Sequence, residues 1–264
     1  MKRALMTAVT VVLLAAFAYC GWRYYSEAFL PRKQLADAYK AQRELFESIR
    51  PDMEGASSAG QPVPDSPGGQ ENDTAGDPLA ELKAVNGEAV GWLTIDGTNI
   101  DYPIVQAADN SSYLKKGFDK KPNRGLGCPF LDCRCDSGFT GFDSIVYAHH
   151  IKGNQAMFAD IEKFKDISFM QKNQTGRLLT ADGVHNVRFF AYLTLPSDSF
   201  AYNVSFEKET DKEEYIDSIF ENARYTAGYT SDELKENKDL HLLLLSTCTY
   251  EYWAARGVLA GVIE

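Results

Sequence analysis

A cysteine near the end of the chain has the neighbours that a nucleophilic thiol needs. Cys248 closes the stretch LLLLSTC, and Arg256 follows eight positions later. A cysteine attacks as its thiolate, which a nearby cation or base stabilises, and acyl transfer also needs a donor where the carbonyl oxygen becomes negative. Arginine stays protonated at physiological pH, so Arg256 can stabilise charge but cannot be the base. Without such company, a lone cysteine in an apolar run is an inert core residue.

The acid or base must then be a histidine, and the chain has four. His185 lies in a polar turn and is expected at the surface. His241 shares the predicted strand of Cys248 at an odd spacing, which points the two side chains to opposite faces. His149 and His150 close the run SIVYAHH. Adjacent residues of a strand face opposite sides, so one of the pair can enter a site, and the residues alone leave the choice open.

The elements that must position these residues are mainly strands. Short runs rich in Val, Ile, Tyr and Phe alternate with Gly, Asn, Asp and Pro, which predicts an antiparallel sheet or a closed barrel. A hairpin would return Arg256 to the side of Cys248. The predicted strands cover residues 91–95, 100–105, 144–148, 176–180, 187–195, 240–247 and 257–263.

Helical patterns occupy three further places in the same part of the chain. A short helix begins at Leu79 and is closed by Gly87, and a second covers residues 157–164. The third covers residues 208–225, with apolar residues on one face and acidic residues opposite. The acidic face is expected to be solvated.

The N-terminus predicts a membrane segment. Residues 4–22 carry no charge, and about 20 apolar residues are needed to cross a bilayer as a helix. We therefore expect an uncleaved single-pass signal-anchor over residues 1–22, with the rest of the chain extracellular. A cleaved signal peptide and a lipoprotein signal ending at Cys20 are the alternatives.

Two further segments separate this anchor from the predicted catalytic domain, residues 79–264. Apolar residues at helical spacing predict a juxtamembrane helix within residues 23–50, and the short stripe favours a solvated helix over a coiled-coil contact. Gly, Pro, Ser and Asp dominate residues 51–78, which predicts a flexible linker.

Charge and cysteine content narrow the function. The net charge of −10 and the lack of a basic stripe exclude nucleic-acid binding.

Three of the five cysteines form the C-x4-C-x-C cluster Cys128, Cys133 and Cys135. The C-x-C spacing is a poor zinc clamp, so structural thiols are favoured over a disulfide involving Cys128 and over a metal site. A thiol redox or metal-binding protein that uses this cluster is the alternative function.

The segments YAHH, LSTC and the Arg256 strand, in this order after an N-terminal anchor, resemble the class B sortases, cysteine transpeptidases of Gram-positive cell surfaces. Residues 90–106 resemble the opening strands of that branch, and the helix of residues 208–225 matches its helical insertion before the cysteine strand. The resemblance implies a mainly β fold, a closed eight-stranded barrel with an N-terminal helix, and no metal or organic cofactor.

The resemblance also implies residue roles. His149 rather than His150 would be the catalytic histidine, although Ala148 stands where the family usually has glycine. Cys248 would be the nucleophile and Arg256 the oxyanion stabiliser. The residues expected to line the substrate groove are Tyr147, Ser246 and Thr247.

The implied partners are secreted proteins with a C-terminal sorting motif, cleaved after threonine through a thioester. The acyl group would pass to an amine of a cell-wall precursor or to a lysine of a pilin. The sequence leaves this choice of acceptor open.

Overall fold

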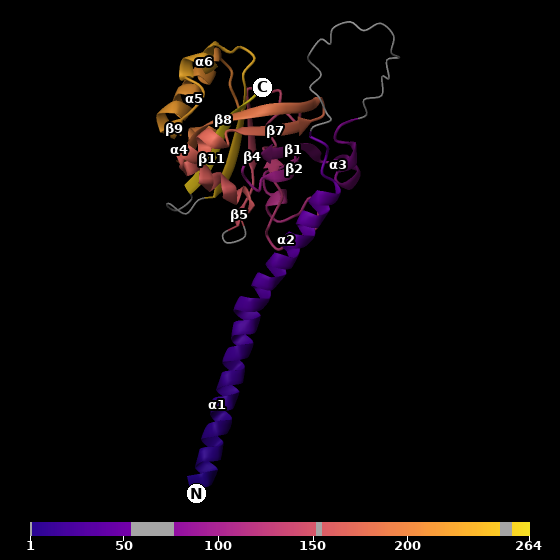
Figure 1. The fold of residues 1–264 in the computed structure, drawn as a ribbon, viewed down its shortest axis with the longest axis vertical. Helices are drawn as coiled ribbons and strands as arrows, with labels where there is room; N and C mark the ends of the chain where they lie inside the picture. Colours follow the sequence, from indigo (N-terminus) through magenta and orange to yellow (C-terminus); the bar gives the residue numbers. More distant parts are fainter. Residues whose placement is uncertain (1, 54–76, 152–154, 249–254) are drawn as a thin grey trace.

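The computed structural model describes residues 2–53, 77–151, 155–248 and 255–264 (Figure 1). Most of the predicted linker lies outside these ranges, as does the segment that joins Cys248 to the last strand. A barrel forms the body of the molecule, and a long N-terminal helical rod projects from it.

Eight strands close the barrel, as predicted. Their order is β11-β10-β4-β3-β2-β1-β7-β8, and pairing of β8 with β11 completes the ring. Most neighbours are antiparallel, but β4 with β10 and β2 with β3 are parallel. The strands are β1 (Ala89–Ile95), β2 (Asp101–Val105), β3 (Phe130–Leu131), β4 (Asp143–Tyr147), β7 (Thr175–Thr180), β8 (Gly183–Pro196), β10 (His241–Cys248) and β11 (Ala255–Ile263).

All the strands predicted from the sequence are present, and the ones that were missed are short. These are β3, the hairpin of β5 (His150–Ile151) and β6 (Ala156–Met157), and β9 (Ala223–Thr226), which pairs with β8 outside the ring. Runs of two to four residues cannot display the alternation that identifies a strand.

The predicted helix of residues 157–164 is instead the 3-10 helix η3 (Phe158–Lys165), followed by α4 (Ile167–Lys172). Asp166 separates the two, and its carboxylate caps α4 by accepting a hydrogen bond from the Ser168 amide at 2.8 Å.

The four leucines before Cys248 face two different cores. Leu243 and Leu245 belong to the cluster inside the barrel. Leu242 and Leu244 belong to a second cluster, which includes Ile216 of α5 (Glu209–Asn222). Because successive side chains of a strand point to opposite faces, a strand buried on both faces needs an unbroken apolar run.

The helical insertion predicted before the cysteine strand is present, and it covers the outer face of β10. It consists of α5 and α6 (Ser231–Glu236), with Ala223–Thr226 leaving the helix to form β9. The predicted third helix therefore ends earlier than expected. A 3-10 turn, η4 (Phe200–Tyr202), leads from β8 toward the insertion.

A buried carboxyl group joins this insertion to the barrel. Asp143 begins β4, and the Tyr215 hydroxyl of α5 donates to its Oδ2 at 2.7 Å. The other oxygen, Oδ1, is buried without a hydrogen-bond partner. Burial raises the pKa of Asp143 to about 7, although the hydrogen bond from Tyr215 opposes the shift.

The N-terminal helices are α1 (Lys2–Tyr24), the π-helical turn η1 (Tyr25–Phe29) and α2 (Leu30–Ser48), which form one rod (Figure 1). The sequence predicts a membrane span over residues 4–22, but within the described ranges no helix is both long and apolar enough to cross a bilayer.

The second half of α2 packs on the barrel, so the expectation of a solvated juxtamembrane helix is wrong for this half. Phe46 is buried and makes edge-to-face contacts with Trp92, Tyr102 and Phe118. Burial of an aromatic ring of this size contributes enough free energy to hold α2 on the barrel, although the apolar stripe of the helix is short. The short helix predicted to begin at Leu79 is also present, as α3 (Ala80–Val85), with Leu82 buried.

The pKa of Asp143 predicts a pH-dependent stability. Its folded pKa lies above the usual 3.8, so the folded state holds a proton that the unfolded state releases, and stability falls as pH rises from about 4 to about 7. In Asp143→Asn we expect this fall to shrink by about 2 kcal/mol between pH 5 and pH 8. Urea unfolding across this range measures it. Asp239→Asn, at an exposed carboxylate, is the control, and an unchanged pH dependence in Asp143→Asn would contradict the prediction.

Candidate active site

A cavity of about 490 Å³ opens at the end of the barrel where β4, β8 and β10 finish and β11 begins. The predicted residues Tyr147, His149, Ser246, Thr247 and Arg256 all line it. The cavity therefore brings together side chains that are more than one hundred positions apart in the sequence.

Parallel pairing of β4 with β10 brings the histidine and cysteine segments together. Tyr147 lies opposite Ser246, and beyond this pair the Ala148 amide donates to the Ser246 carbonyl at 3.2 Å. The Thr247 hydroxyl donates to the Ala148 carbonyl at 2.9 Å. His149 and Cys248 are the next residues of the two segments, so this register brings their backbones to neighbouring positions.

Antiparallel pairing of β10 with β11 supplies the arginine. Cys248 and Arg256 are directly opposite each other in the register. Arg256 is half-buried, with Nη1 3.4 Å from the carbonyl oxygen of Ala255. The predicted hairpin is thus present, with Arg256 paired to Cys248 at the end next to the connection, and the residues of that connection, 249–254, lie outside the described part of the chain.

His149 and His150 have different surroundings. His149 lines the cavity, with Nε2 2.8 Å from the Leu114 carbonyl oxygen. His150 begins β5 and has Nδ1 3.8 Å from Oε1 of Glu162, in η3. Because a carbonyl only accepts, Nε2 of His149 must carry its hydrogen, and Nδ1 is the nitrogen that can accept a proton.

The other two histidines lie elsewhere, as the sequence predicts. His185 lies in the β7–β8 hairpin, with Nε2 3.1 Å from the Thr180 hydroxyl and 3.1 Å from Oδ1 of Asp182. His241 begins β10 at the opposite end from Cys248, with Nδ1 2.9 Å from the Gly141 carbonyl oxygen.

The three predicted groove residues combine structural contacts with a cavity-facing position. The Tyr147 ring stacks on the Tyr202 ring at 6.1 Å and tilts against Phe130 at 5.4 Å. Ser246 is buried, with its hydroxyl 3.0 Å from that of Tyr202. The Thr247 hydroxyl is already used to hold the Ala148 carbonyl.

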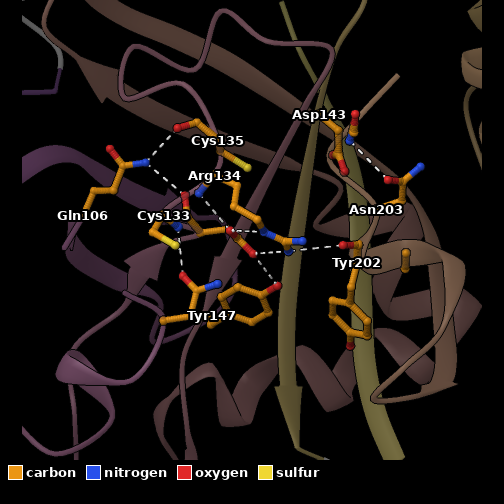
Figure 2. A network of polar contacts seen from close by, with 12 residues as sticks. Gln106, Cys133, Arg134, Cys135, Asp143, Tyr147, Tyr202 and Asn203 are labelled. Atoms are coloured by element: carbon orange, nitrogen blue, oxygen red, sulfur yellow. Dashed lines mark hydrogen bonds and ion pairs between the residues drawn. The ribbon is translucent and has the colours of Figure 1, made fainter. Parts of the chain in front are cut away.

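Sequence reasoning missed several cavity residues, and Arg134 is the most informative. Its guanidinium donates to both oxygens of Asp132, at 2.9 and 2.7 Å, and to the Tyr202 carbonyl at 3.2 Å. Figure 2 shows this side chain extending from the cysteine loop toward Tyr202, near Tyr147. The Asp-x-Arg spacing inside that loop was the available signal. The missed lining residues are Asn110, Leu114, Phe130, Arg134, Ser197 and Tyr202.

The carboxylate of Asp132 is fully buried but stays ionised. Burial alone would raise its pKa, but hydrogen bonds from Arg134, Asn110 and Tyr147 outweigh burial and lower the pKa to about 2. Burial raises the pKa of Tyr147, and the Asp132 charge adds to this effect. The cavity wall therefore presents a neutral phenol and a cation already paired with a carboxylate.

Comparisons with known proteins identify the family. No family model matches the chain. Sortase B of Listeria monocytogenes is 29% identical over 262 residues, which cover 98% of this chain and 97% of that protein. Sortase B of Staphylococcus aureus is 30% identical over 172 residues, which cover 65% of this chain and 67% of that protein.

The chain belongs to the class B sortases. The solved structure of sortase B from Listeria monocytogenes agrees, with 30% identity, a TM-score of 0.60, and coverage of 69% of this chain and 97% of that one. The protein is therefore a cysteine transpeptidase, as the resemblance implied.

The three cysteines of the cluster are free thiols in this sortase. Cys128, Cys133 and Cys135 form no disulfide within the described ranges, where no group of metal-ligating side chains is found either. Burial raises the pKa of Cys128, and it raises that of Cys135 to about 12, which is the opposite of what a reactive thiol needs.

The cluster instead forms a hydrogen-bonded turn. The Gln106 amide donates to the carbonyls of Asp132 and Cys135 at 2.9 and 2.8 Å, and the Cys133 amide donates to the Asn110 side chain at 2.8 Å (Figure 2). This turn holds Arg134 at the cavity.

Proposed function

We propose that this sortase cleaves a C-terminal sorting motif of secreted proteins after a threonine and transfers the acyl group to an amine. The observation that supports the proposal is the meeting of three segments at one cavity. His149 and Arg256 line this cavity, and strand pairing brings the backbone of Cys248 beside both segments.

Acylation would use all three residues. The Cys248 thiolate attacks the threonine carbonyl carbon, and the carbonyl electron pair moves to the oxygen. The Arg256 guanidinium stabilises this oxyanion by charge-assisted hydrogen bonds. As the carbon–nitrogen bond breaks, the leaving nitrogen takes a proton from Nδ1 of the His149 imidazolium, and a thioester remains.

Transfer reverses the proton movement. An acceptor amine attacks the thioester carbon and passes its proton to Nδ1 of His149, while the sulfur leaves as the thiolate. Throughout both steps the Leu114 carbonyl can hold Nε2–H, which keeps the ring in the tautomer that presents Nδ1. The chain's own side chains suffice for this sequence of steps.

The groove around the nucleophile would hold the motif. Tyr147, Tyr202 and Phe130 provide an aromatic wall, and the buried Ser246 hydroxyl lies beside it. An apolar wall with a few fixed polar groups is the usual composition of a small-ligand site. Tyr147, Ser246 and Thr247 are therefore proposed as substrate-binding residues.

Two acceptors fit the proposed chemistry, an amine of a cell-wall precursor and a lysine of a pilin, both outside the cell. A library of peptides with a central threonine, offered with a cell-wall stem peptide or with a lysine peptide, distinguishes them. The masses of the products show which amine has been joined.

Replacing the nucleophile tests the proposed function directly. Cys248→Ala is expected to form no acyl-enzyme with any library peptide, because alanine has no sulfur to attack. Intact-protein mass spectrometry measures the adduct. Cys133→Ala is the matched control and is expected to acylate as wild type. An adduct on Cys248→Ala would refute the assignment of the nucleophile.

The histidine pair gives a second test. His149→Ala is expected to lower kcat/KM by about 1,000-fold or more. General acid–base catalysis typically contributes about 10² to 10⁴ in rate. His150→Ala is expected to keep activity within about threefold, since its ring lies against Glu162 rather than the cavity. Peptide cleavage assays decide, and the reverse pattern would assign the role to His150.

The arginine gives a third test. Arg256→Lys keeps a positive charge but loses the planar fork, so we expect kcat to fall by about 100-fold, the order of magnitude for an oxyanion donor. Steady-state cleavage measures it, and Arg188→Lys, at a surface arginine elsewhere in the barrel, controls for the substitution. Wild-type turnover in Arg256→Lys would show that charge alone is enough.

A further inference from the structure

We propose that Gln42, in helix α2, is a positioning residue for His149 and that α2 is therefore part of the catalytic unit. The proposal rests on the catalytic role of His149 proposed above. It comes from a chain of contacts that runs from the rod-like N-terminus to the imidazole.

The last link of this chain is the loop that encloses the His149 ring. The Leu114 carbonyl oxygen lies 2.8 Å from Nε2. On another side of the ring lies Gly127, at φ +68°, where an added Cβ would come within 3.0 Å of His149 Cδ2 and 2.7 Å of the Tyr113 carbonyl oxygen. The Gly127 backbone thus lies beside the imidazole with no room for a side chain between them, so its position limits where the ring can lie.

The two parts of the loop are tied to each other. The Cys128 amide donates to the Tyr113 carbonyl at 3.0 Å, next to the peptide whose Leu114 carbonyl holds the ring. Tyr113 is itself buried, and its hydroxyl accepts a hydrogen bond from Asn86 at 2.7 Å. The position of Gly127 therefore also sets the position of the Leu114 carbonyl.

Gln42 fixes Gly127. The Gly127 carbonyl accepts from Nε2 of Gln42 at 3.0 Å and from Nδ2 of Asn123 at 2.8 Å, and its amide donates to Oδ1 of Asn123 at 3.0 Å. Nδ2 of Asn123 also lies 3.2 Å from Oε1 of Gln42. The two side-chain amides and the glycine peptide form one closed network.

The burial of Gln42 shows that this contact is specific. The side chain is 7% exposed, on a helix whose neighbouring polar residues face solvent. Burying an amide is unfavourable unless it is hydrogen-bonded, and an apolar residue would pack here at no such cost. Phe46, one helical turn further along, anchors the same face of α2 among Trp92, Tyr102 and Phe118.

The consequence is that α2 contributes to catalysis without touching the substrate cavity. A displacement of about 1 Å at a reacting group can cost on the order of 100-fold in rate. Since Asn123 would still hold Gly127 after loss of Gln42, we expect a smaller effect, about 10-fold in kcat.

The test is Gln42→Met in the full chain, which keeps the volume and removes both hydrogen bonds. Glu44→Met, at an exposed position of the same helix, is the matched control. Three quantities are measured: kcat and KM for the peptide selected from the threonine library, the imidazole nitrogen NMR signals of His149, and the midpoint of urea unfolding.

We expect Gln42→Met to lower kcat about 10-fold with KM unchanged within twofold, and to mix or broaden the His149 tautomer signals, while Glu44→Met matches wild type. Wild-type kcat and wild-type His149 signals in Gln42→Met would overturn the proposal, and so would a loss of kcat with unchanged signals. If Gln42→Met fails to fold, Gln42→Glu, which replaces the donating NH2 by a carboxylate oxygen facing the Gly127 carbonyl, decides by the same readouts.

The NMR readout separates this inference from the proposed function. If His149→Ala retains full activity, the proposed catalytic role fails. The effect of Gln42→Met on the His149 tautomer would still show whether α2 positions the ring.

Discussion

The parallel pairing of β4 with β10 is the constraint on which the site depends. The pairing ends at Tyr147 and Ser246, and two further hydrogen bonds continue it to Ala148 and Thr247. One residue beyond, the two segments reach His149 and Cys248. Because a sheet fixes neighbouring backbones about 5 Å apart, a pairing in this register brings the two positions together without any loop having to do so.

This pairing is stable because β10 is buried on both faces. Its leucines fill the barrel on one side and pack against α5 on the other. The helical insertion is therefore not a peripheral addition but the second wall of the cysteine strand. A one-residue slip of β10 would exchange the two leucine faces and move Cys248 away from both His149 and Arg256.

The polar groups around the cavity are held in a different way. Asp132 keeps its charge in a buried place because Arg134, Asn110 and Tyr147 all bond to it. The loop around His149 depends on two side-chain amides that meet at one glycine carbonyl. Both networks join segments far apart in the sequence, so each ties the site to the closing of the whole barrel.

The sequence by itself determined the chemistry and most of the strands. The run of leucines, the arginine after the cysteine and the histidine pair were visible as residue types, and strand alternation located every long strand of the barrel. Strands of only a few residues, such as β3 and β9, carry no periodic signal. They are identified only by their pairing with neighbouring strands in the folded chain.

Only the tertiary structure distinguished the surroundings of the neighbouring histidines, placed Arg134 at the cavity and brought Gln42 of α2 to Gly127. His149 and His150 are adjacent residues of the same type. They differ in their surroundings, since His149 lines the cavity and His150 lies near Glu162. From the sequence alone, Gln42 is one of several polar residues on a helix that is expected to be solvated. In the structure, Gln42 and Phe46 are both buried on one face of that helix. The same physical reason applies to the histidine pair, to α2 and to Arg134. Local sequence sets backbone preference and side-chain chemistry, whereas burial and hydrogen-bond partners come from segments that meet only when the barrel closes.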